Sequence, residues 1–222
     1  MKKIITTLLV ASLIVLAGCT KIATTPKENT TCSIDSGASC EDSIEPDPAK
    51  VEEAKPDMTN KEQVIEYALN ALKNNSIDQL AEVTSKEGIW FSPYSFLDTD
   101  KHIILKKEDF KDAYSWEVKY VWGTEDGSGY PIIMTFKEYV KKYVYDLDFS
   151  TLAERNIDKI VQRGNSINNI EDIFTGVSTI EFYVPGINPD YAGMDRRSLT
   201  FVLQQEENEW KIKAIVHSQR TI

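Results

Sequence analysis

The sequence predicts an α+β domain in which helices come first and mostly antiparallel strands follow. Three observations predict this class. Apolar residues over 64–72 recur with helical spacing, several later segments alternate apolar and polar residues, and short turn sequences separate those segments. Helices followed by a run of strands favour α+β over repeated βαβ units.

The helices are expected near the start of this domain. Thr59 and Glu62 form a capping-box pattern, which predicts that a helix begins at Thr59. Its buried face has the spacing i, i+3, i+4, i+7, i+8 and consists of Val64, Tyr67, Ala68, Ala71 and Leu72. Asn74-Asn75 should end this helix.

Two further capping patterns predict two more helices. Ser76 with Gln79 should start a short second helix that runs towards Val83. Thr135 with Glu138 should start a third, although the Val and Tyr residues that follow also suit strands.

Strands should fill the rest of the chain. Glu206-Glu207-Asn208 is expected as a hairpin turn between the last two strands, and Asp126-Gly127-Ser128-Gly129 as another turn. The expected strands are Gly88–Phe91, His102–Leu105, Trp116–Trp122, Asp158–Arg163, Val177–Val184, Leu199–Gln204 and Trp210–His217.

The N-terminus has the pattern of a secretory signal peptide over residues 1–18. Lys2 and Lys3 precede an apolar run from Ile4 to Leu16, which is too short to span a bilayer as a helix. Leu16-Ala17-Gly18-Cys19 resembles the lipobox of bacterial lipoproteins. The resemblance implies cleavage before Cys19, a diacylglycerol on its sulfur with acyl chains such as palmitate, and lipid anchoring at the cell membrane or cell envelope on the extracytoplasmic face.

Residues 19–57 are expected to form a lipidated, disordered tether, and residues 58–222 a single domain. The segment after Cys19 is rich in Thr, Ser, Pro, Glu, Asp and Lys, and has no aromatic residue to bury. As a coil it would reach roughly 35 Å. Cys32 and Cys40 could form a disulfide in an oxidising compartment or stay as free thiols, and the sequence leaves both open.

The charge of the chain excludes one class of partner. The formal net charge is −10, and no basic stripe interrupts it. Nucleic acid is therefore not an expected partner, and the link to a lipid bilayer should be the acyl chain rather than electrostatic attraction.

The domain resembles the NTF2-like (cystatin-like cone) fold, and more specifically a group of uncharacterised bacterial lipoproteins. The fold resemblance depends on two N-terminal helices, the segment 88–94 and the long closing strands. It implies helices packed on a curved, mostly antiparallel sheet. The motifs shared with the lipoproteins are Phe91-Ser92-Pro93-Tyr94, Trp122-Gly123, Asp126-Gly127-Ser128-Gly129, Tyr143-Val144-Tyr145-Asp146, residues 164–169, Pro185-Gly186, Gly193-Met194-Asp195 and Ile215-Val216-His217 with Gln219.

A fold of this kind often leaves a cavity inside its sheet, and the chain has aromatic residues that could line one. Candidate ligand-binding residues are Trp90, Tyr94, Trp122, Tyr183 and His217, with Trp116 and Tyr120 as further aromatic candidates. The alternative is that the aromatic side chains form the hydrophobic core, because a core alone is enough to explain how many of them the chain has.

His217 is the one candidate for general-base chemistry. Strict alternation along the last strand puts it on the face of Ile215 and opposite Trp210, Ile212, Ala214 and Val216. Its carboxylate partner could be Asp126, Asp146, Asp148 or Asp195, and a purely structural histidine is the alternative.

The other groups of polar residues do not indicate a metal site or a catalytic site. Asp98, Asp100 and His102 would share a face only on a strand, and their segment has the composition of a polar loop, so no metal site is expected. Ser92 and Ser95 lack the pattern of a catalytic serine. No cofactor is expected.

Three functions therefore stay open. The preferred one is a membrane-tethered lipoprotein whose non-catalytic domain binds a small molecule or an envelope protein. The second is an enzyme that uses His217 and a carboxylate. The third is an assembly role through the sheet face, for example as a homodimer.

Overall fold

The computed structural model describes residues 54–115, 117–163 and 166–220. The signal peptide, Cys19, Cys32, Cys40, most of the expected tether and Trp116 lie outside the described residues. In the described part of the chain, no helix is long and apolar enough to cross a membrane.

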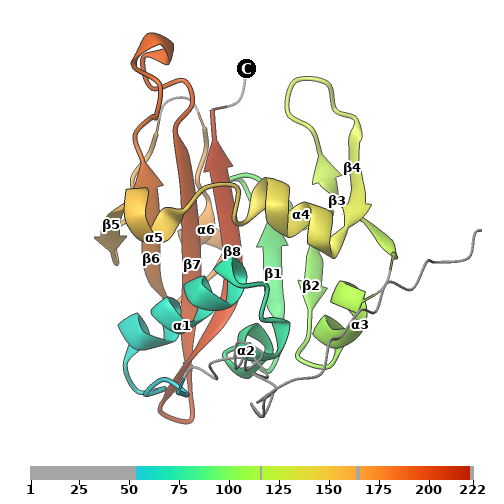
Figure 1. Cartoon of the computed structure of the whole chain (residues 1–222), viewed down its shortest axis with the longest axis vertical. Coiled ribbons are helices and arrows are strands. Elements are labelled where there is room, and N and C mark those ends of the chain that lie inside the picture. Colours follow the sequence, from blue (N-terminus) through green and yellow to red (C-terminus); the bar gives the residue numbers. More distant parts are fainter. Residues whose placement is uncertain (1–53, 116, 164–165, 221–222) are drawn as a thin grey trace, which may run out of the picture. The chain divides into compact units, whose positions relative to one another are not determined.

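The described chain forms an α+β domain (Figure 1). A six-stranded sheet has the order β2-β1-β8-β7-β6-β5, in which only β1 and β8 run parallel, and β3 and β4 form a separate antiparallel pair. In chain order the elements are α1 Lys61–Lys73, α2 Ile77–Glu82, β1 Ile89–Ser92, β2 Ile103–Leu105, α3 Asp109–Ser115, β3 Lys119–Thr124, β4 Pro131–Thr135, α4 Phe136–Tyr143, α5 Phe149–Leu152, β5 Glu154–Ile157, α6 Ile170–Ile173, β6 Ser178–Val184, β7 Arg197–Glu206 and β8 Glu209–Gln219, with a 3-10 turn at Pro189–Tyr191.

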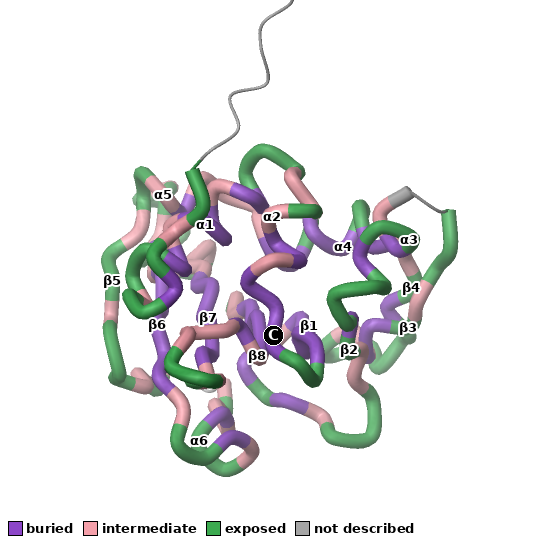
Figure 2. Tube along the Cα trace, turned by 90° about the horizontal axis from the view of Figure 1, so that it is seen from below, coloured by how far each residue is buried: buried purple, intermediate pink, exposed green. Residues whose placement is uncertain are grey.

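The row of strands bends around the helices, as the view along the strands shows (Figure 2). Helices α1, α2 and α4 lie on the inner side of the bend, and α6 lies on the outer side. This is the predicted arrangement of helices on a curved, mostly antiparallel sheet, and it is the architecture that the NTF2-like resemblance implies.

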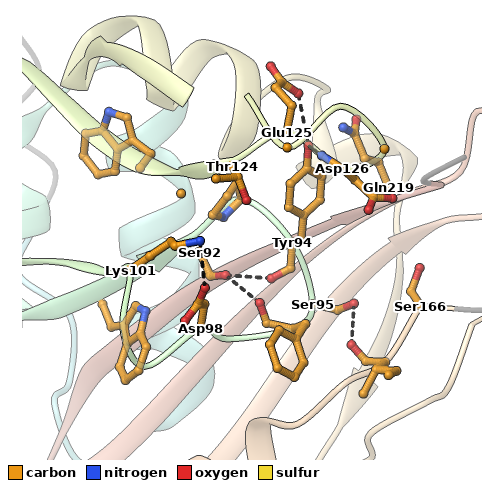
Figure 3. A pocket seen from close by; sticks show the side chains of 18 residues that line it. Ser92, Tyr94, Ser95, Asp98, Lys101, Thr124, Glu125, Asp126, Ser166 and Gln219 are labelled. Atoms are coloured by element: carbon orange, nitrogen blue, oxygen red, sulfur yellow. Dashed lines mark hydrogen bonds and ion pairs between the residues drawn. The ribbon is translucent and has the colours of Figure 1, made fainter. Parts of the chain in front are cut away.

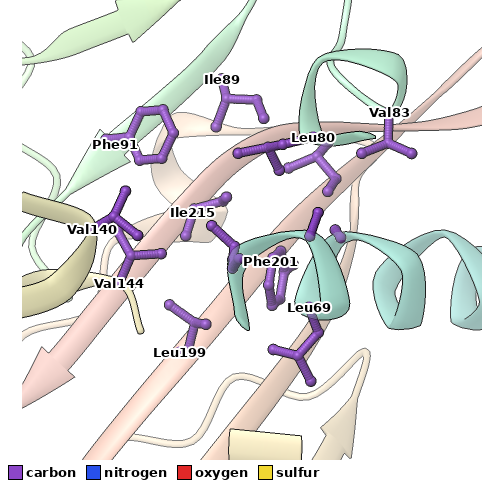
Figure 4. Packing of buried hydrophobic residues seen from close by; sticks show 14 of the residues in the cluster. Leu69, Leu80, Val83, Ile89, Phe91, Val140, Val144, Leu199, Phe201 and Ile215 are labelled. Carbon is purple, nitrogen blue, oxygen red and sulfur yellow. The ribbon is translucent and has the colours of Figure 1, made fainter. Parts of the chain in front are cut away.

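The main hydrophobic core lies between the inner side of the sheet and the helices. Leu199, Phe201 and Ile215 of the sheet meet Leu69 of α1 and Val140 of α4 (Figure 4). A smaller cluster on the outer side of the sheet packs Trp90, Val202 and Val216 against residues of α6. Because both faces of the central strands are covered, β7 is buried along most of its length.

The first helix begins one residue later than the capping pattern predicts. The N-cap is Asn60, whose side chain accepts hydrogen bonds from the backbone N–H groups of Glu62 and Gln63. Thr59 is not free to cap, because both its N–H and its hydroxyl donate to the carboxylate of Asp57.

The other two capping predictions have different outcomes. Helix α4 is confirmed, and both arms of its capping box between Thr135 and Glu138 are present. Ser76 is the N-cap of α2 as predicted, but its side chain makes no capping hydrogen bond.

The predicted strand at Asp158–Arg163 is wrong, because the strand lies earlier, at β5. Asp158 has a φ of 51°, a left-handed conformation that ends the strand. Its carboxylate accepts hydrogen bonds from the hydroxyl of Ser178 and the N–H of Thr179, which hold that conformation. The hairpin turn after Glu206 is confirmed, with φ of 50° at Glu207 and 70° at Asn208, as a tight two-residue turn requires.

Strand β8 contains one extra residue, and this reverses part of the predicted side-chain pattern. Val202 pairs with Ala214 whereas Leu203 pairs with Ile212, so Lys213 is bulged out of the pairing. A bulge shifts the alternation by one residue. Ile212 therefore packs in the same inner core as Ile215, whereas Ala214 and Val216 belong to the outer cluster. The prediction that Trp210 and Ile212 lie opposite His217 is wrong for this reason.

Candidate functional site

An open pocket of about 620 Å³ lies at the end of the sheet where β1 and β8 finish (Figure 3). Four segments that are distant in the sequence form it: the loop after β1, the β3–β4 hairpin, the segment before α6 and the end of β8. The lining residues are Trp90, Ser92, Pro93, Tyr94, Ser95, Phe96, Asp98, Lys101, Trp122, Gly123, Thr124, Glu125, Asp126, Gly127, Gly129, Ser166, Ile167 and Gln219.

The loop after β1 is held in place by local hydrogen bonds. The Ser92 hydroxyl donates to the carbonyl of Tyr94 (2.7 Å), and the Ser95 hydroxyl donates to the carbonyl of Ile167 (3.1 Å). The side chain of Asn169 bonds both the N–H and the carbonyl of Leu97. This wall of the pocket is therefore fixed before any ligand arrives.

Glu125 fastens the hairpin wall to the rest of the domain. Its carboxylate accepts hydrogen bonds from the hydroxyls of Tyr94 (3.2 Å) and Tyr143 (3.1 Å) and from the ammonium of Lys142 (3.1 Å). Burial opposes ionisation of Glu125, but these bonds and the charge of Lys142 lower its pKa below the usual value. Burial, together with the nearby Glu125 carboxylate, raises the pKa of Tyr143 to about 12.

Two tryptophans form the buried base of the pocket. Trp122 is 0% exposed, stacks on Tyr139 at 3.9 Å between ring centroids, and donates its indole N–H to the carbonyl of Met134. Trp90 is 9% exposed and stacks on His102 at 4.2 Å. Both tryptophans are buried, and both line the pocket. The two predicted alternatives, a place in the core and a place in a cavity wall, are therefore not exclusive for these residues.

His217 is fully buried and lies behind the pocket rather than in it. Its Nδ1 is 3.3 Å from the carbonyl oxygen of Pro93, a lining residue, and its Nε2 is 3.4 Å from Oδ1 of Asp146. The other Asp146 oxygen accepts a hydrogen bond from Nε of Arg197 (3.0 Å). The structure therefore brings His217 together with Asp146 out of the four candidate carboxylates.

The two neighbours of His217 are both hydrogen-bond acceptors. A carbonyl and a carboxylate accept hydrogen bonds and donate none. Nε2 and Oδ1 of Asp146 are too poorly aligned for a full hydrogen bond, and among the described residues neither atom has another hydrogen-bond partner. Burial opposes ionisation of Asp146, but His217 and Arg197 lower the pKa of its carboxyl.

The other candidate carboxylates lie elsewhere. Asp126 is exposed on the β3–β4 hairpin and lines the pocket. Asp148 is bound to Lys73, Tyr145 and Ser150. Asp195 accepts from the backbone N–H groups of Ile187 and Asn188.

Tyr183 lies away from the pocket. It is on β6, and the guanidinium carbon of Arg163 lies 3.3 Å from its ring centroid. Arg163 is in turn paired with Glu181 (2.8 Å). Of the predicted ligand-binding residues, the structure thus places Trp90, Tyr94 and Trp122 in the pocket lining, His217 behind it and Tyr183 outside it.

Several lining residues are not among the candidates from the sequence, notably Phe96, Thr124, Ser166 and Gln219. The Gly-rich turn at 126–129 and the Ser-Pro-Tyr segment at 92–94 mark two of the four walls, but no sequence periodicity connects them. Among the described residues, no group of three or more His, Cys, Asp or Glu side chains is placed to hold a metal ion.

No family model matches the chain, and no curated protein matches it. Among solved structures, one similar chain has NTF2 in its name; it is 12% identical, the match covers 71% of this chain and 95% of that one, and the TM-score is 0.32. A second, from Xanthomonas campestris, is named as a calcium/calmodulin dependent protein kinase II association domain; it is 11% identical, with 71% and 83% covered and a TM-score of 0.31. Likenesses this distant transfer no ligand or partner to this chain. The class that the strand order and the pocket define is an α+β domain with one open end.

Proposed function

We propose that this protein is a membrane-tethered extracytoplasmic lipoprotein whose domain binds a small molecule in the pocket at the end of β1 and β8. The observation that carries the proposal is the pocket itself: about 620 Å³, with walls that are already fixed by hydrogen bonds. Volumes of roughly 300–1,000 Å³ are usual for small-molecule sites. The lipid anchor rests on the Leu-Ala-Gly-Cys19 pattern.

The position of the pocket agrees with a tethered receptor. The described chain starts beside the β7–β8 turn, where the carbonyl of Met58 accepts a hydrogen bond from the N–H of Trp210 (2.7 Å). The pocket includes Gln219 at the other end of β8, an 11-residue strand that spans roughly 33 Å. A tether from Cys19 would therefore hold the domain by the end that is far from the pocket.

Binding is favoured over catalysis because of where His217 lies. A general base needs hydrogen-bond reach to its substrate. His217 is fully buried, and Pro93 lies between its ring and the pocket. Both ring nitrogens face partners within the protein rather than the pocket.

The test is to fill the pocket with a larger side chain and to measure whether a small molecule that co-purifies with the protein is lost. Thr124 lines the pocket, and in Thr124→Trp an indole replaces a methyl and a hydroxyl there. The full chain and this variant would be purified in mild detergent from their own envelope, and small molecules released on denaturation would be compared by mass spectrometry. We expect a molecule that accompanies the natural chain and is depleted in Thr124→Trp.

The matched control is Thr175→Trp, which places the same ring at an exposed site outside the pocket lining. It should keep the molecule. The proposal fails if no molecule accompanies the natural chain, or if both tryptophan variants retain it equally while remaining folded by circular dichroism.

A further inference from the structure

We propose that the ligand of this pocket carries a positive charge, such as an ammonium group, and that Asp126 receives it. This inference rests on the proposed function and adds a chemical class to it. The observation behind it is the charge balance of the pocket lining, in which one carboxylate has no partner.

Four charged side chains line the pocket, and three of them are paired. Lys101, the one cation among the lining residues, lies 4.0 Å from Asp98. Glu125 is paired with Lys142 and also accepts from two tyrosine hydroxyls. Among the described residues, Asp126 has no hydrogen-bond or ion-pair partner for its carboxylate. When Lys142, which pairs with Glu125 from outside the lining, is counted as well, the pocket has one negative charge in excess, and the whole chain is also acidic.

Asp126 is held at a defined place despite its exposure. Its backbone N–H donates to the hydroxyl of Tyr94 (3.3 Å), and that hydroxyl in turn donates to Glu125. Gly127 follows with a φ of 80°, which forms the turn at the hairpin tip. Figure 3 shows Asp126 close to Tyr94 and Gln219 at the same side of the pocket. Tyr94 and Asp126 therefore line the same side of the pocket.

Aromatic rings beside a carboxylate are a suitable environment for an ammonium group. The ring faces attract a cation through their quadrupole, and the carboxylate adds direct charge attraction. Tyr94, the ring next to Asp126, is half-buried and so has surface to offer, and Phe96, which is 52% exposed, lines the same pocket. An anionic ligand would meet the excess negative charge and would find its only lining cation already paired with Asp98.

The test compares two probes that have the same shape and differ in charge. Choline is a quaternary ammonium, and 3,3-dimethylbutan-1-ol replaces its nitrogen with carbon. Binding of each to the full chain in non-ionic detergent would be measured by ligand-observed NMR titration, with the anion 3,3-dimethylbutanoate as a third probe. We expect choline to bind about fivefold more tightly or better than the neutral alcohol, and the anion to bind least.

Asp126→Asn should remove the preference for choline, and Asp78→Asn should keep it. Asp78 is exposed at the start of α2 and outside the pocket lining, so its variant changes the net charge of the chain equally. Equal binding of choline and the alcohol would overturn the inference, and so would a choline preference that survives in Asp126→Asn or no binding of either probe.

These failures can be told apart from failure of the proposed function. A neutral or anionic molecule that accompanies the natural chain and is depleted in Thr124→Trp would overturn the positive charge while supporting a binding pocket. A co-purified amine that Asp126→Asn releases would support both.

Discussion

At the scale of single residues, His217 bears on the enzyme hypothesis that the sequence leaves open. A histidine in a strand beside an apolar residue is compatible with a base, a ligand contact or a structural group. The structure adds what the sequence cannot give: the identity of both neighbours. The carbonyl of Pro93 and the carboxylate of Asp146 are far away in sequence, and both only accept hydrogen bonds.

We therefore expect His217 to have a structural role, in which it bridges the carbonyl of Pro93 and the carboxylate of Asp146. His217→Leu should destabilise the protein by roughly 1–3 kcal/mol, since it leaves the buried Oδ1 of Asp146 without its neighbour while Arg197 still pairs with Oδ2. Urea unfolding would measure this loss, and a leucine variant of unchanged stability would contradict this account.

The tyrosines around Glu125 predict how stability depends on alkaline pH. Burial raises the pKa of Tyr143 to about 12, and it raises that of Tyr94 as well. An unfolded tyrosine has a pKa near 10. Because the folded state holds these protons more tightly, their contribution to stability is complete below about pH 10. It is lost as the pH rises from there through about 12.

Absorbance of tyrosinate and circular dichroism, followed together with pH, would check this prediction. Tyr143→Phe should weaken the loss of stability over that range, because the phenol that resists ionisation is gone. Tyr191→Phe is the control, since Tyr191 is exposed on the β6–β7 loop. A natural chain whose stability is flat between pH 10 and 12 would show that burial of the phenols has no such effect.

At the scale of elements, the sequence predicts what depends on neighbours along the chain and misses what depends on neighbours in space. The capping box of α4 and the turn after Glu206 are local, and both are confirmed. The start of α1 moves to Asn60 because Asp57 occupies Thr59. The end of β5 depends on contacts of Asp158 with β6, which lies about 20 residues later.

The bulge at Lys213 gives a prediction that is specific to one element. Deleting Lys213 would restore strict alternation, so either Ile212 or Ile215 with His217 would turn away from the inner core. We expect the deletion to abolish cooperative unfolding in a urea titration. Lys213→Ala keeps the residue count and loses mainly an exposed ion pair with Glu87, so it should cost no more than about 1 kcal/mol. A deletion variant that unfolds like Lys213→Ala would show that the bulge has no role in setting the register.

At the scale of the whole molecule, the candidate site is the feature that the sequence predicts least well. The aromatic content predicts that Trp90, Tyr94 and Trp122 lie near a cavity, because large rings commonly line both cores and pockets. Asp126 and Gln219 enter the site because the hairpin tip and the end of β8 meet in space. Their approach depends on the hydrogen bonds of Glu125, which join residues 94, 125 and 143. No spacing along the chain encodes that meeting.

The proposed link between the domain and the membrane depends on one residue, Cys19. If Cys19 carries the lipid, Cys19→Ala should block processing or release the protein, because an acidic domain has no electrostatic hold on anionic lipid. Membrane fractionation and labelling with a radioactive fatty acid would measure this, with Cys32→Ala as the control that removes a thiol outside the Leu-Ala-Gly-Cys pattern. The domain should be unaffected: in both variants the tyrosine titration and the choline preference should match those of the natural chain, because every residue that forms the pocket lies beyond residue 89. Unchanged lipid labelling and membrane association in Cys19→Ala would disprove the anchor, and the pocket would then belong to a protein held at the envelope in another way.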